Sequence, residues 1–388
     1  MKYSNIATIL NSELVLNALG SQNAVVPEDL SSVVELGTSV ANLTADQVKN
    51  FTKAVIAGVY NYVINREIET GDFKLLRDEQ TYGGCLQRIM NKGMLDAKDS
   101  YILNPQPNVN YWDGQYYGPD VDSKIYEETK AFKTIISLSD DAFNQYFSTP
   151  SDVAKLFALI ENNERNTVKY QLYQLEKRII VTLAASAVSG SRVVPLVTLF
   201  NNNVLGVASI SDPGWKTYSD IKADRDLAAY FQSYAKEVIM RLRDRMKDVQ
   251  STLNDGTVET WSRSNDIYAM FISEFLQDMT FLGSPVQYHE RSLDMNYDSM
   301  TCWQYPGNAV LPDLSSCSTI TLDVNGSTVT EGGIVGVIYD IEGAGITVRV
   351  NKTVAEGPVP EGFVNYHHHL AANYYVDERL SSVAISLN

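Results

Sequence analysis

The chain has 388 residues, of which 44% are hydrophobic, so it is long enough to bury a large core. Its net charge of −16, from 47 acidic and 31 basic residues, argues against a surface that grips nucleic-acid phosphates, because such a surface needs clustered lysine and arginine. Three cysteines without a CxxC pair argue against a disulfide framework and indicate a reducing compartment, and no apolar run is long enough to predict a membrane span.

The first 65 residues are predicted to be helical. In "TADQVKNFTKAVIAGVYNYVI", Thr44 is a plausible helix cap, and hydrophobic residues recur at steps of three or four from Val48 to Val63. This spacing is typical of a helix with one hydrophobic face.

The segment from about 95 to 128 is predicted to be a long loop, because its three prolines exclude a continuous helix. Its aromatic residues speak against disorder, and they are Tyr101, Tyr111, Trp112, Tyr116, Tyr117 and Tyr126. Two interpretations remain open. The loop covers its own domain, or it is an arm that lays its aromatic side chains on a neighbouring subunit, since tyrosine and tryptophan are enriched at interfaces.

Two long helices are predicted in the centre of the chain. The first begins near Ser151 or Asp152 as its cap and continues to about 190, and the second covers roughly 219–250. The second ends in a basic cluster, Arg241, Arg243, Arg245 and Lys247. A nucleic-acid contact is one interpretation of this cluster. A solvated helix end is favoured, because cations there complement the helix dipole and Asp244 and Asp248 are interleaved as local partners.

The last part of the chain is predicted to be rich in β-structure. Residues 263–282 form a short aromatic-rich helix, capped by Asn265 or Asp266. After it, "STITLDVNGSTVTEGGIVGVIYDIEGAGITVRVNKTV" alternates apolar and polar residues and contains the turn signal "NGS". The order of these elements predicts an α+β fold.

No catalytic, cofactor or metal motif is found in the sequence, which lacks a phosphate-binding glycine loop, a G-x-S-x-G elbow and an H-E-x-x-H helix. The run His367–His369 is the strongest candidate for metal binding. In a strand, His367 and His369 would share one face about 6–7 Å apart, and His368 would take the other face. Three consecutive histidines cannot all reach one tetrahedral site, so we expect a packing or interface role, with metal binding and pH sensing as the alternatives.

The C-terminal segment carries a resemblance to a known family. A strand ending in Tyr339 and Asp340, the run from Asn365 to His369, and Arg379 before the final "SSVAISL" resemble the end of major capsid proteins from small short-tailed (podovirus-type) bacteriophages. The resemblance implies the tailed-phage capsid fold. Its expected segments are an N-terminal helical arm (1–65), an extended-loop region (66–150, with the loop at about 95–128), a spine helix of the peripheral domain (151–190), an axial domain (191–330) and a β-rich return to the peripheral domain (331–388).

The resemblance further implies a protein that assembles with itself, as pentamers and hexamers, into the icosahedral shell of a virion that encloses double-stranded DNA. Scaffolding and portal proteins are expected partners, DNA contacts are expected to be non-specific, and the host cytoplasm is the expected location before assembly. No enzymatic activity, cofactor or membrane contact is expected. The residues proposed for contacts between subunits are Tyr111, Trp112, Tyr116, Tyr117, Lys124 and Tyr126. Two alternatives stay open, a bacterial nanocompartment shell of the same fold and a metal-dependent enzyme using His367 and His369.

Overall fold

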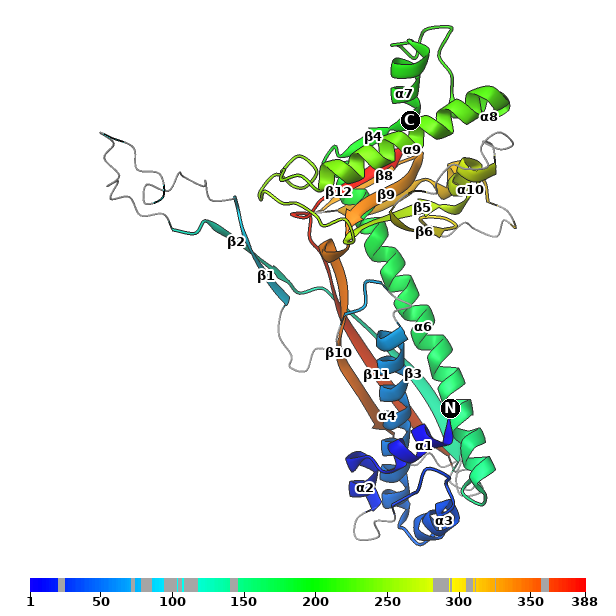
Figure 1. The fold of residues 1–388 in the computed structure, drawn as a ribbon. Helices are drawn as coiled ribbons and strands as arrows, with labels where there is room; N and C mark the ends of the chain where they lie inside the picture. The colour runs from blue at the N-terminus through cyan, green and yellow to red at the C-terminus, as the bar shows by residue number, and fades with distance from the viewer. Residues whose placement is uncertain are drawn as a thin grey trace. The chain divides into compact units, whose positions relative to one another are not determined.

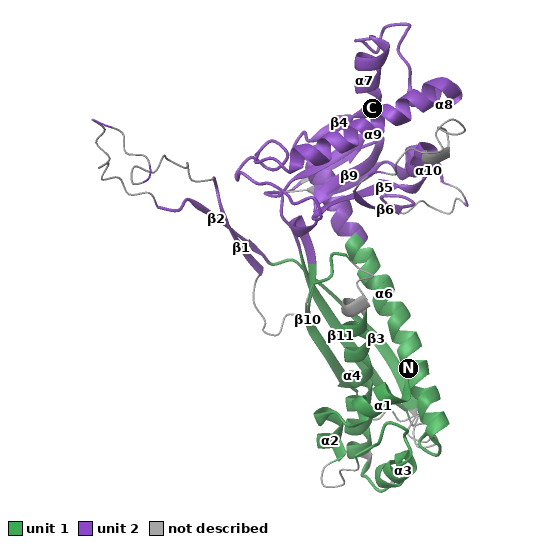
Figure 2. Ribbon diagram, in the orientation of Figure 1, with its two compact units in different colours: residues 1–84, 127–176, 346–374 green, residues 85–126, 177–345, 375–388 purple. Residues whose placement is uncertain are grey.

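A computed structural model describes residues 1–19, 25–70, 74–77, 86–93, 103, 107, 118–139, 146–281, 293, 295–304, 310, 312–324, 326–356 and 363–388. The chain forms two compact units, which Figure 2 shows in green and purple. Unit 1 takes residues 1–84, 127–176 and 346–374, and unit 2 takes residues 85–126, 177–345 and 375–388. Each unit is therefore built from stretches that are distant in the sequence.

Unit 1 combines helices with a three-stranded sheet (Figure 1). The helices are α1 (Tyr3–Leu10), α2 (Glu13–Leu19), α3 (Val33–Ala41), α4 (Ala45–Thr70) and the first part of α6 (Pro150–Ser189). The strands, in sheet order, are β10 (Ala344–Ala355), β11 (Phe363–Val376) and β3 (Thr129–Ser139). Strands β11 and β3 are antiparallel, and His368 lies opposite Thr134.

The core of unit 1 lies between its helices and one face of this sheet. It includes Ile6, Phe51, Phe157, Ile136 and Tyr366, which come from α1, α4, α6, β3 and β11. The predicted hydrophobic face of α4 is confirmed, because its side chains from Val48 to Val63 at the expected spacing are buried. From the segment expected to form an N-terminal helical arm, residues of the described ranges 1–19 and 25–63 contribute to this core.

Helix α6 covers Pro150–Ser189, in agreement with the helix expected at 151–190, and it runs without interruption through Asn163 and Asn166. The expected cap at Ser151 or Asp152 is wrong. The Thr149 hydroxyl accepts a hydrogen bond from the Asp152 backbone N–H at 3.2 Å and donates to the Asp152 carboxylate at 2.6 Å. Pro150 takes the first helical position, where its missing N–H costs nothing.

Unit 2 is built on a five-stranded sheet of order β4–β12–β9–β5–β6. These strands are β4 (Val193–Pro195), β12 (Ser382–Ser386), β9 (Ile334–Asp340), β5 (Ile267–Ile272) and β6 (Asn296–Met300). Every residue of β9 and β12 is buried, so both faces of the sheet centre are covered. The remaining elements are β1 (Leu86–Asn91), β2 (Val121–Tyr126), α7 (Leu196–Phe200), the π-helix η1 (Asn201–Leu205), α8 (Tyr218–Ala223), α9 (Arg225–Met246), α10 (Ser273–Phe281), α11 (Leu314–Cys317), β7 (Ile320–Val324), β8 (Ser327–Glu331) and the 3₁₀-helix η2 (Ile341–Gly343).

Two predicted helices of unit 2 are wrong in extent. The helix expected at 219–250 is divided at Asp224, whose carboxylate accepts hydrogen bonds from the backbone N–H groups of Asp226 and Leu227 and so starts α9. The helix expected at 263–282 begins only at Ser273. The residues before it form β5, because Ile267, Ala269 and Phe271 alternate into the core and pair with β9.

The predicted turn after β7 is confirmed, since β7 and β8 form an antiparallel hairpin in which Gly326 has a φ of +82°.

The expectation that the cysteines form no disulfide framework is overturned, because Cys302 and Cys317 form a disulfide. Both cysteines are buried, and their Cα atoms are 4.2 Å apart although 15 residues separate them in the sequence. Among the helices of the described ranges, none combines the length and the hydropathy that a membrane crossing requires.

Candidate functional site

Strands β1 and β2 form a two-stranded antiparallel ribbon, called here the β1–β2 ribbon (Figure 1). Leu86 lies opposite Tyr126, and Asn91 lies opposite Val121. Four residues that were expected to make subunit contacts, Tyr111, Trp112, Tyr116 and Tyr117, lie outside the described residues. Lys124 and Tyr126 lie in β2, with the Lys124 ammonium 5.5 Å from the centre of the Tyr126 ring.

One face of the ribbon packs on its own unit. Tyr126 belongs to this face, and it is buried against the Tyr375 ring, with centroids 5.4 Å apart. Tyr126 therefore packs within its own chain, and Lys124, on the same face, is half-buried. Alternation along a strand places their sequence neighbours Ser123 and Ile125 on the opposite, exposed face.

A buried arginine holds the inner face of the ribbon. The Arg379 guanidinium donates from Nε and Nη2 to the two carboxylate oxygens of Asp377, at 2.9 and 3.0 Å, and from Nη1 to Asp122 Oδ2 of β2, at 2.8 Å. It also donates from Nη2 to the Arg88 carbonyl of β1 at 3.3 Å and to the Tyr126 hydroxyl at 3.4 Å. We call these five residues the Arg379 cluster. It joins both strands of the ribbon to the segment before β12.

The charges of the Arg379 cluster are strongly coupled. Burial alone would raise the pKa of Asp377, but hydrogen bonds from Arg379 and Tyr126 and the charge of Arg379 outweigh it, so the pKa lies below its usual value. The bonds to Asp377 also raise the pKa of Arg379. Burial, followed by the charge of Asp377, raises the pKa of Tyr126. The cluster is therefore a fixed ion pair at neutral pH and has no group poised for proton transfer.

Acid is expected to loosen the ribbon only at low pH. Because the pKa of Asp377 is depressed, its contribution to stability is present above the ordinary value of 3.8 and is lost as the pH falls through the lower, folded-state value. Hydrogen exchange of the β1 and β2 amides, compared at about pH 5 and about pH 3 after correction for intrinsic rates, measures this loss. An Asp377→Asn variant should be loosened already at the higher pH. Equal exchange in the two proteins at both pH values would contradict the prediction.

A second contact supports the ribbon from β1. Arg88 donates from Nη1 to the Glu342 carbonyl at 2.7 Å and from Nη2 to the Glu342 carboxylate at 2.9 Å. The ion pair between Lys92 and Asp120, at 3.0 Å, contributes little to stability, because both side chains are exposed to solvent. The ribbon is thus held mainly by buried and half-buried arginines.

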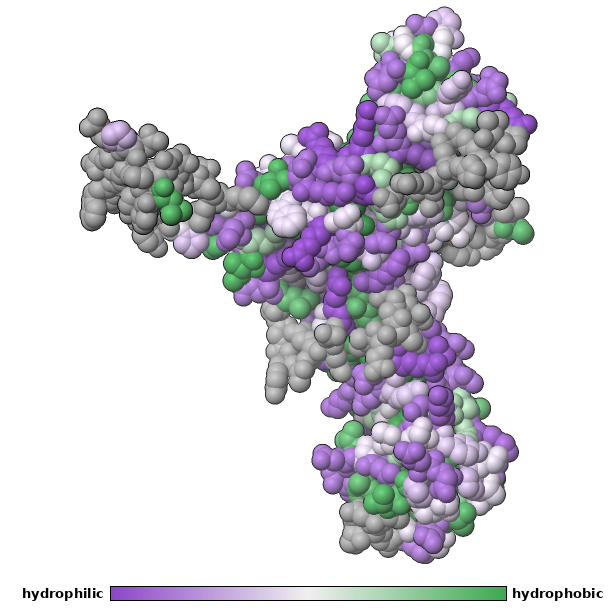
Figure 3. All heavy atoms as spheres, in the orientation of Figure 1, coloured by the Kyte–Doolittle hydropathy of each residue, from purple (hydrophilic) through white to green (hydrophobic). Residues whose placement is uncertain are grey.

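The outer face of the β1–β2 ribbon carries three branched apolar side chains among the polar residues Gln87, Asn91 and Ser123, and it is exposed in the part of the chain that the structure describes. Ile89, Val121 and Ile125 are 62%, 46% and 55% exposed. Ile89 lies opposite Ser123, so the two isoleucines and the valine are diagonal neighbours across the ribbon. Figure 3 shows hydrophobic residues among hydrophilic ones on the surface over this ribbon. A rigidly held strand pair with exposed branched side chains has the properties of a protein-binding surface.

The histidine run is divided as the strand pattern predicts. The rings of His367 and His369 lie on one face with centroids 6.5 Å apart, and the ring of His368 stacks on Tyr60 of α4. His367 Nε2 lies 2.9 Å from Glu356 Oε1, an interaction that lowers the pKa of Glu356. In the part of the chain that the structure describes, no three histidine, cysteine or acidic side chains are grouped to hold a metal ion.

The basic cluster at the end of α9 has local acidic partners. Arg241 pairs with Glu237 at 2.6 Å, and Arg243 and Lys247 pair with Asp244 at 2.9 and 2.8 Å. Asp244 is one of the two partners that the sequence predicts. These contacts favour the solvated helix end over a nucleic-acid contact.

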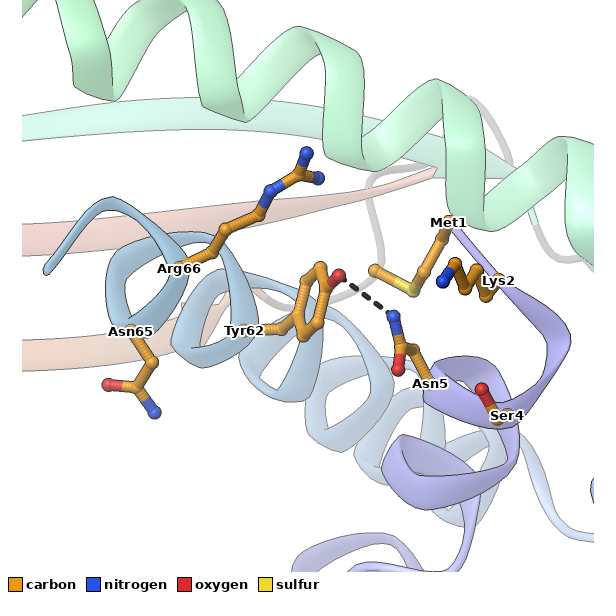
Figure 4. A pocket seen from close by; sticks show the side chains of 7 residues that line it. All are labelled: Met1, Lys2, Ser4, Asn5, Tyr62, Asn65 and Arg66. Atoms are coloured by element: carbon orange, nitrogen blue, oxygen red, sulfur yellow. Dashed lines mark hydrogen bonds between the residues drawn. The ribbon is translucent and has the colours of Figure 1, made fainter. Parts of the chain in front are cut away.

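An open pocket of about 860 Å³ lies in unit 1 between the start of α1 and α4 (Figure 4). The Asn5 side-chain amide donates to the Tyr62 hydroxyl at 2.8 Å, and Arg66 pairs with Glu161 of α6 at 3.0 Å. The residues that line it are Met1, Lys2, Ser4, Asn5, Tyr62, Asn65 and Arg66. This lining contains no carboxylate and no histidine.

The sequence alone did not identify the Arg379 cluster. The sequence places Arg379 only as a basic residue before the last strand and gives no pairing for it. The usable signal was an arginine two residues after an aspartate at the start of a buried strand, a spacing that suits a bidentate pair. The third member, Asp122, is 257 residues distant from Arg379 in the sequence.

Comparison with known proteins identifies the family. The family model "Phi29-like phage major capsid protein" matches residues 13–386. A solved capsid structure of Staphylococcus phage Andhra is 13% identical, with a TM-score of 0.49 over 82% of this chain and 84% of that one. The mature capsid of bacteriophage PhiM1 is 12% identical, with a TM-score of 0.41 over 80% and 84% of the two chains.

The search of curated proteins finds no significant match. The family model nevertheless covers nearly the whole chain, including both units and the β1–β2 ribbon. The chain therefore belongs to the family of Phi29-like phage major capsid proteins, which form the shell of the virion.

Proposed function

We propose that this capsid protein assembles through the outer face of its β1–β2 ribbon, which packs on a neighbouring copy of the chain. The observation that carries this proposal is the contrast between the two faces of the ribbon. Arg379 and Tyr126 hold the inner face, while Ile89, Val121 and Ile125 on the outer face are exposed. A shell needs such a surface, because each subunit must bury apolar area against the next one.

Burial of this face would supply part of the free energy of a shell contact, because Ile89, Val121 and Ile125 still expose about half of their side-chain surface. Burying a branched aliphatic side chain contributes about 1.5–3 kcal/mol. The buried ion pair of Arg379 limits the freedom of the ribbon before contact, so less conformational entropy is lost on assembly. The aromatic residues Tyr111, Trp112, Tyr116 and Tyr117 and the half-buried Lys124 remain our proposed further contacts.

We further propose an icosahedral shell of pentamers and hexamers that encloses double-stranded DNA. The net charge of −16 supports DNA contacts that are weak and non-specific, because a surface of this charge repels phosphates. Scaffolding and portal proteins are the expected partners during assembly, which would take place in the host cytoplasm.

Electron microscopy of the purified protein tests this function. We expect closed shells or sheets of capsomers at high protein concentration, and the particle diameter and local symmetry give the arrangement of subunits. Assembly with a scaffolding protein from the same genome should be measured in parallel, since some shells need one to nucleate. A monodisperse monomer under both conditions would refute assembly as proposed.

A further inference from the structure

A chain of polar contacts joins the helices of unit 1 to its sheet. The Thr134 hydroxyl of β3 donates to Glu164 Oε2 of α6 at 2.9 Å, and it lies 2.7 Å from the Tyr60 hydroxyl of α4. Because Thr134 uses its one hydrogen on Glu164, Tyr60 is the donor to Thr134. Both Tyr60 and Glu164 are buried, so these three residues connect α4, β3 and α6 within the core.

His368 closes this chain of contacts from the sheet. Its ring lies flat on the Tyr60 ring, with centroids 3.3 Å apart and planes 8° from parallel. Its Nδ1 atom lies 3.2 Å from the Thr353 hydroxyl of β10, and its Nε2 atom has no hydrogen-bond partner among the described residues. The imidazole is 1% exposed. In the tautomer with its hydrogen on Nδ1, the neutral ring donates to the Thr353 hydroxyl, whereas protonation would add a buried Nε2–H without an acceptor among the described residues.

We propose that His368 makes the packing of α4 and α6 on the sheet of unit 1 sensitive to acid, so that unit 1 opens at a pH at which unit 2 is still closed. The titratable groups around the ring are Tyr60 from α4, Glu164 from α6 and His369 on its own strand. Strands β3 and β10 contribute only the neutral hydroxyls of Thr134 and Thr353. The inference rests on the core of unit 1 and does not depend on the assembly contact proposed above.

The direction of the effect follows from the protonation of each group. Burial, with a smaller effect from His369, lowers the pKa of His368 from 6.5 to about 3. Its contribution to stability is therefore complete above pH 6.5 and is lost as the pH falls toward 3. In this range the equilibrium constant for opening should rise about tenfold per pH unit from this residue alone.

Glu164 acts in the opposite direction. Burial raises its pKa above 4.5, so the closed unit takes up a proton at Glu164 before the open unit does. Protonation of Glu164 therefore offsets part of the His368 effect between its raised pKa and 4.5. In unit 2, the depressed pKa of Asp377 gives a loss that begins only below 3.8. Because the loss from His368 accumulates as the pH falls from 6.5, the difference between the units should be largest near pH 3.8, just before the loss from Asp377 begins.

Peptide-resolved hydrogen exchange of the full, unassembled chain tests the proposal, with rates corrected for the intrinsic effect of pH. In the wild type, peptides from α4 and α6 up to Glu176 should lose protection at a higher pH than peptides from β9 and β12. His368→Gln retains a donor for Thr353 but does not titrate, so the dependence at mildly acidic pH should disappear. His369→Gln is the matched control, because its exposed ring lies on the other face and has only the smaller effect on the pKa of His368, so unit 1 should still lose protection at a higher pH than unit 2.

A Glu164→Gln variant gives an independent test if His368→Gln does not fold. It removes the protonation of Glu164 that offsets the His368 effect. The equilibrium constant for opening should therefore increase about tenfold per pH unit between the raised pKa of Glu164 and 4.5, where in the wild type it levels off. Two results would overturn the proposal. One is a wild-type pH dependence in His368→Gln or in Glu164→Gln, and the other is loss of protection in unit 2 before unit 1.

Discussion

Replacing Arg379 with methionine is expected to detach the β1–β2 ribbon from the rest of unit 2 and to prevent shell assembly. Methionine preserves much of the volume but removes both hydrogen bonds that Arg379 donates to the buried carboxylate of Asp377, whose remaining cationic neighbour is Arg88, with Nε 3.8 Å from Asp377 Oδ2. Breaking a buried ion pair in this way costs about 3–5 kcal/mol. Hydrogen exchange should show loss of protection in β1 and β2, chemical denaturation should show the loss of stability, and electron microscopy should show no shells.

A double variant separates loss of the ion pair from loss of the fold. In Arg379→Met with Asp377→Asn, no net charge remains buried at the pair, so much of the stability lost in the single variant should return. Asp122 and Tyr126 would still lack their bonds to Arg379, so the ribbon should stay looser than in the wild type. Wild-type protection of β1 and β2 in the single variant would show that Arg379 does not hold the ribbon.

Changing Ile89 and Ile125 together to asparagine is expected to abolish assembly without unfolding the subunit. Both side chains are more than half exposed, so the substitutions should alter the free energy of unfolding by less than about 1 kcal/mol. The same substitutions remove the apolar area that we propose is buried in each contact between copies, and the contact repeats throughout a shell. Sedimentation velocity and electron microscopy at matched concentrations measure the outcome.

The matched control keeps the hydrophobic surface. Ile89→Val with Ile125→Val retains branched apolar side chains of high strand propensity and should still form shells. The denaturation midpoints of both double variants should agree with that of the wild type. Normal shells from the asparagine variant would exclude the outer face of the ribbon as an assembly contact.

Local periodicity made several elements readable from the sequence. The helical spacing in α4 and α6 identified both helices, because one turn relates residues three or four apart whatever surrounds them. Strand alternation predicted the two faces of the histidine run, and the His367 and His369 rings lie 6.5 Å apart on one of them. The sequence failed at β5, where pairing with β9 decides the conformation of a segment that also suits a helix.

By itself, the sequence determined the α+β class, the long helix α6, the family to which the chain belongs and the alternation of the histidines. Only the tertiary structure decided which residues meet. Arg379 donates to Asp122, which lies 257 positions earlier in the sequence, and the ring of His368 stacks on Tyr60 of a helix that is distant in the sequence. Local patterns predict the conformation of residues that are close in the sequence, whereas the partner of a buried charge depends on how the whole unit folds.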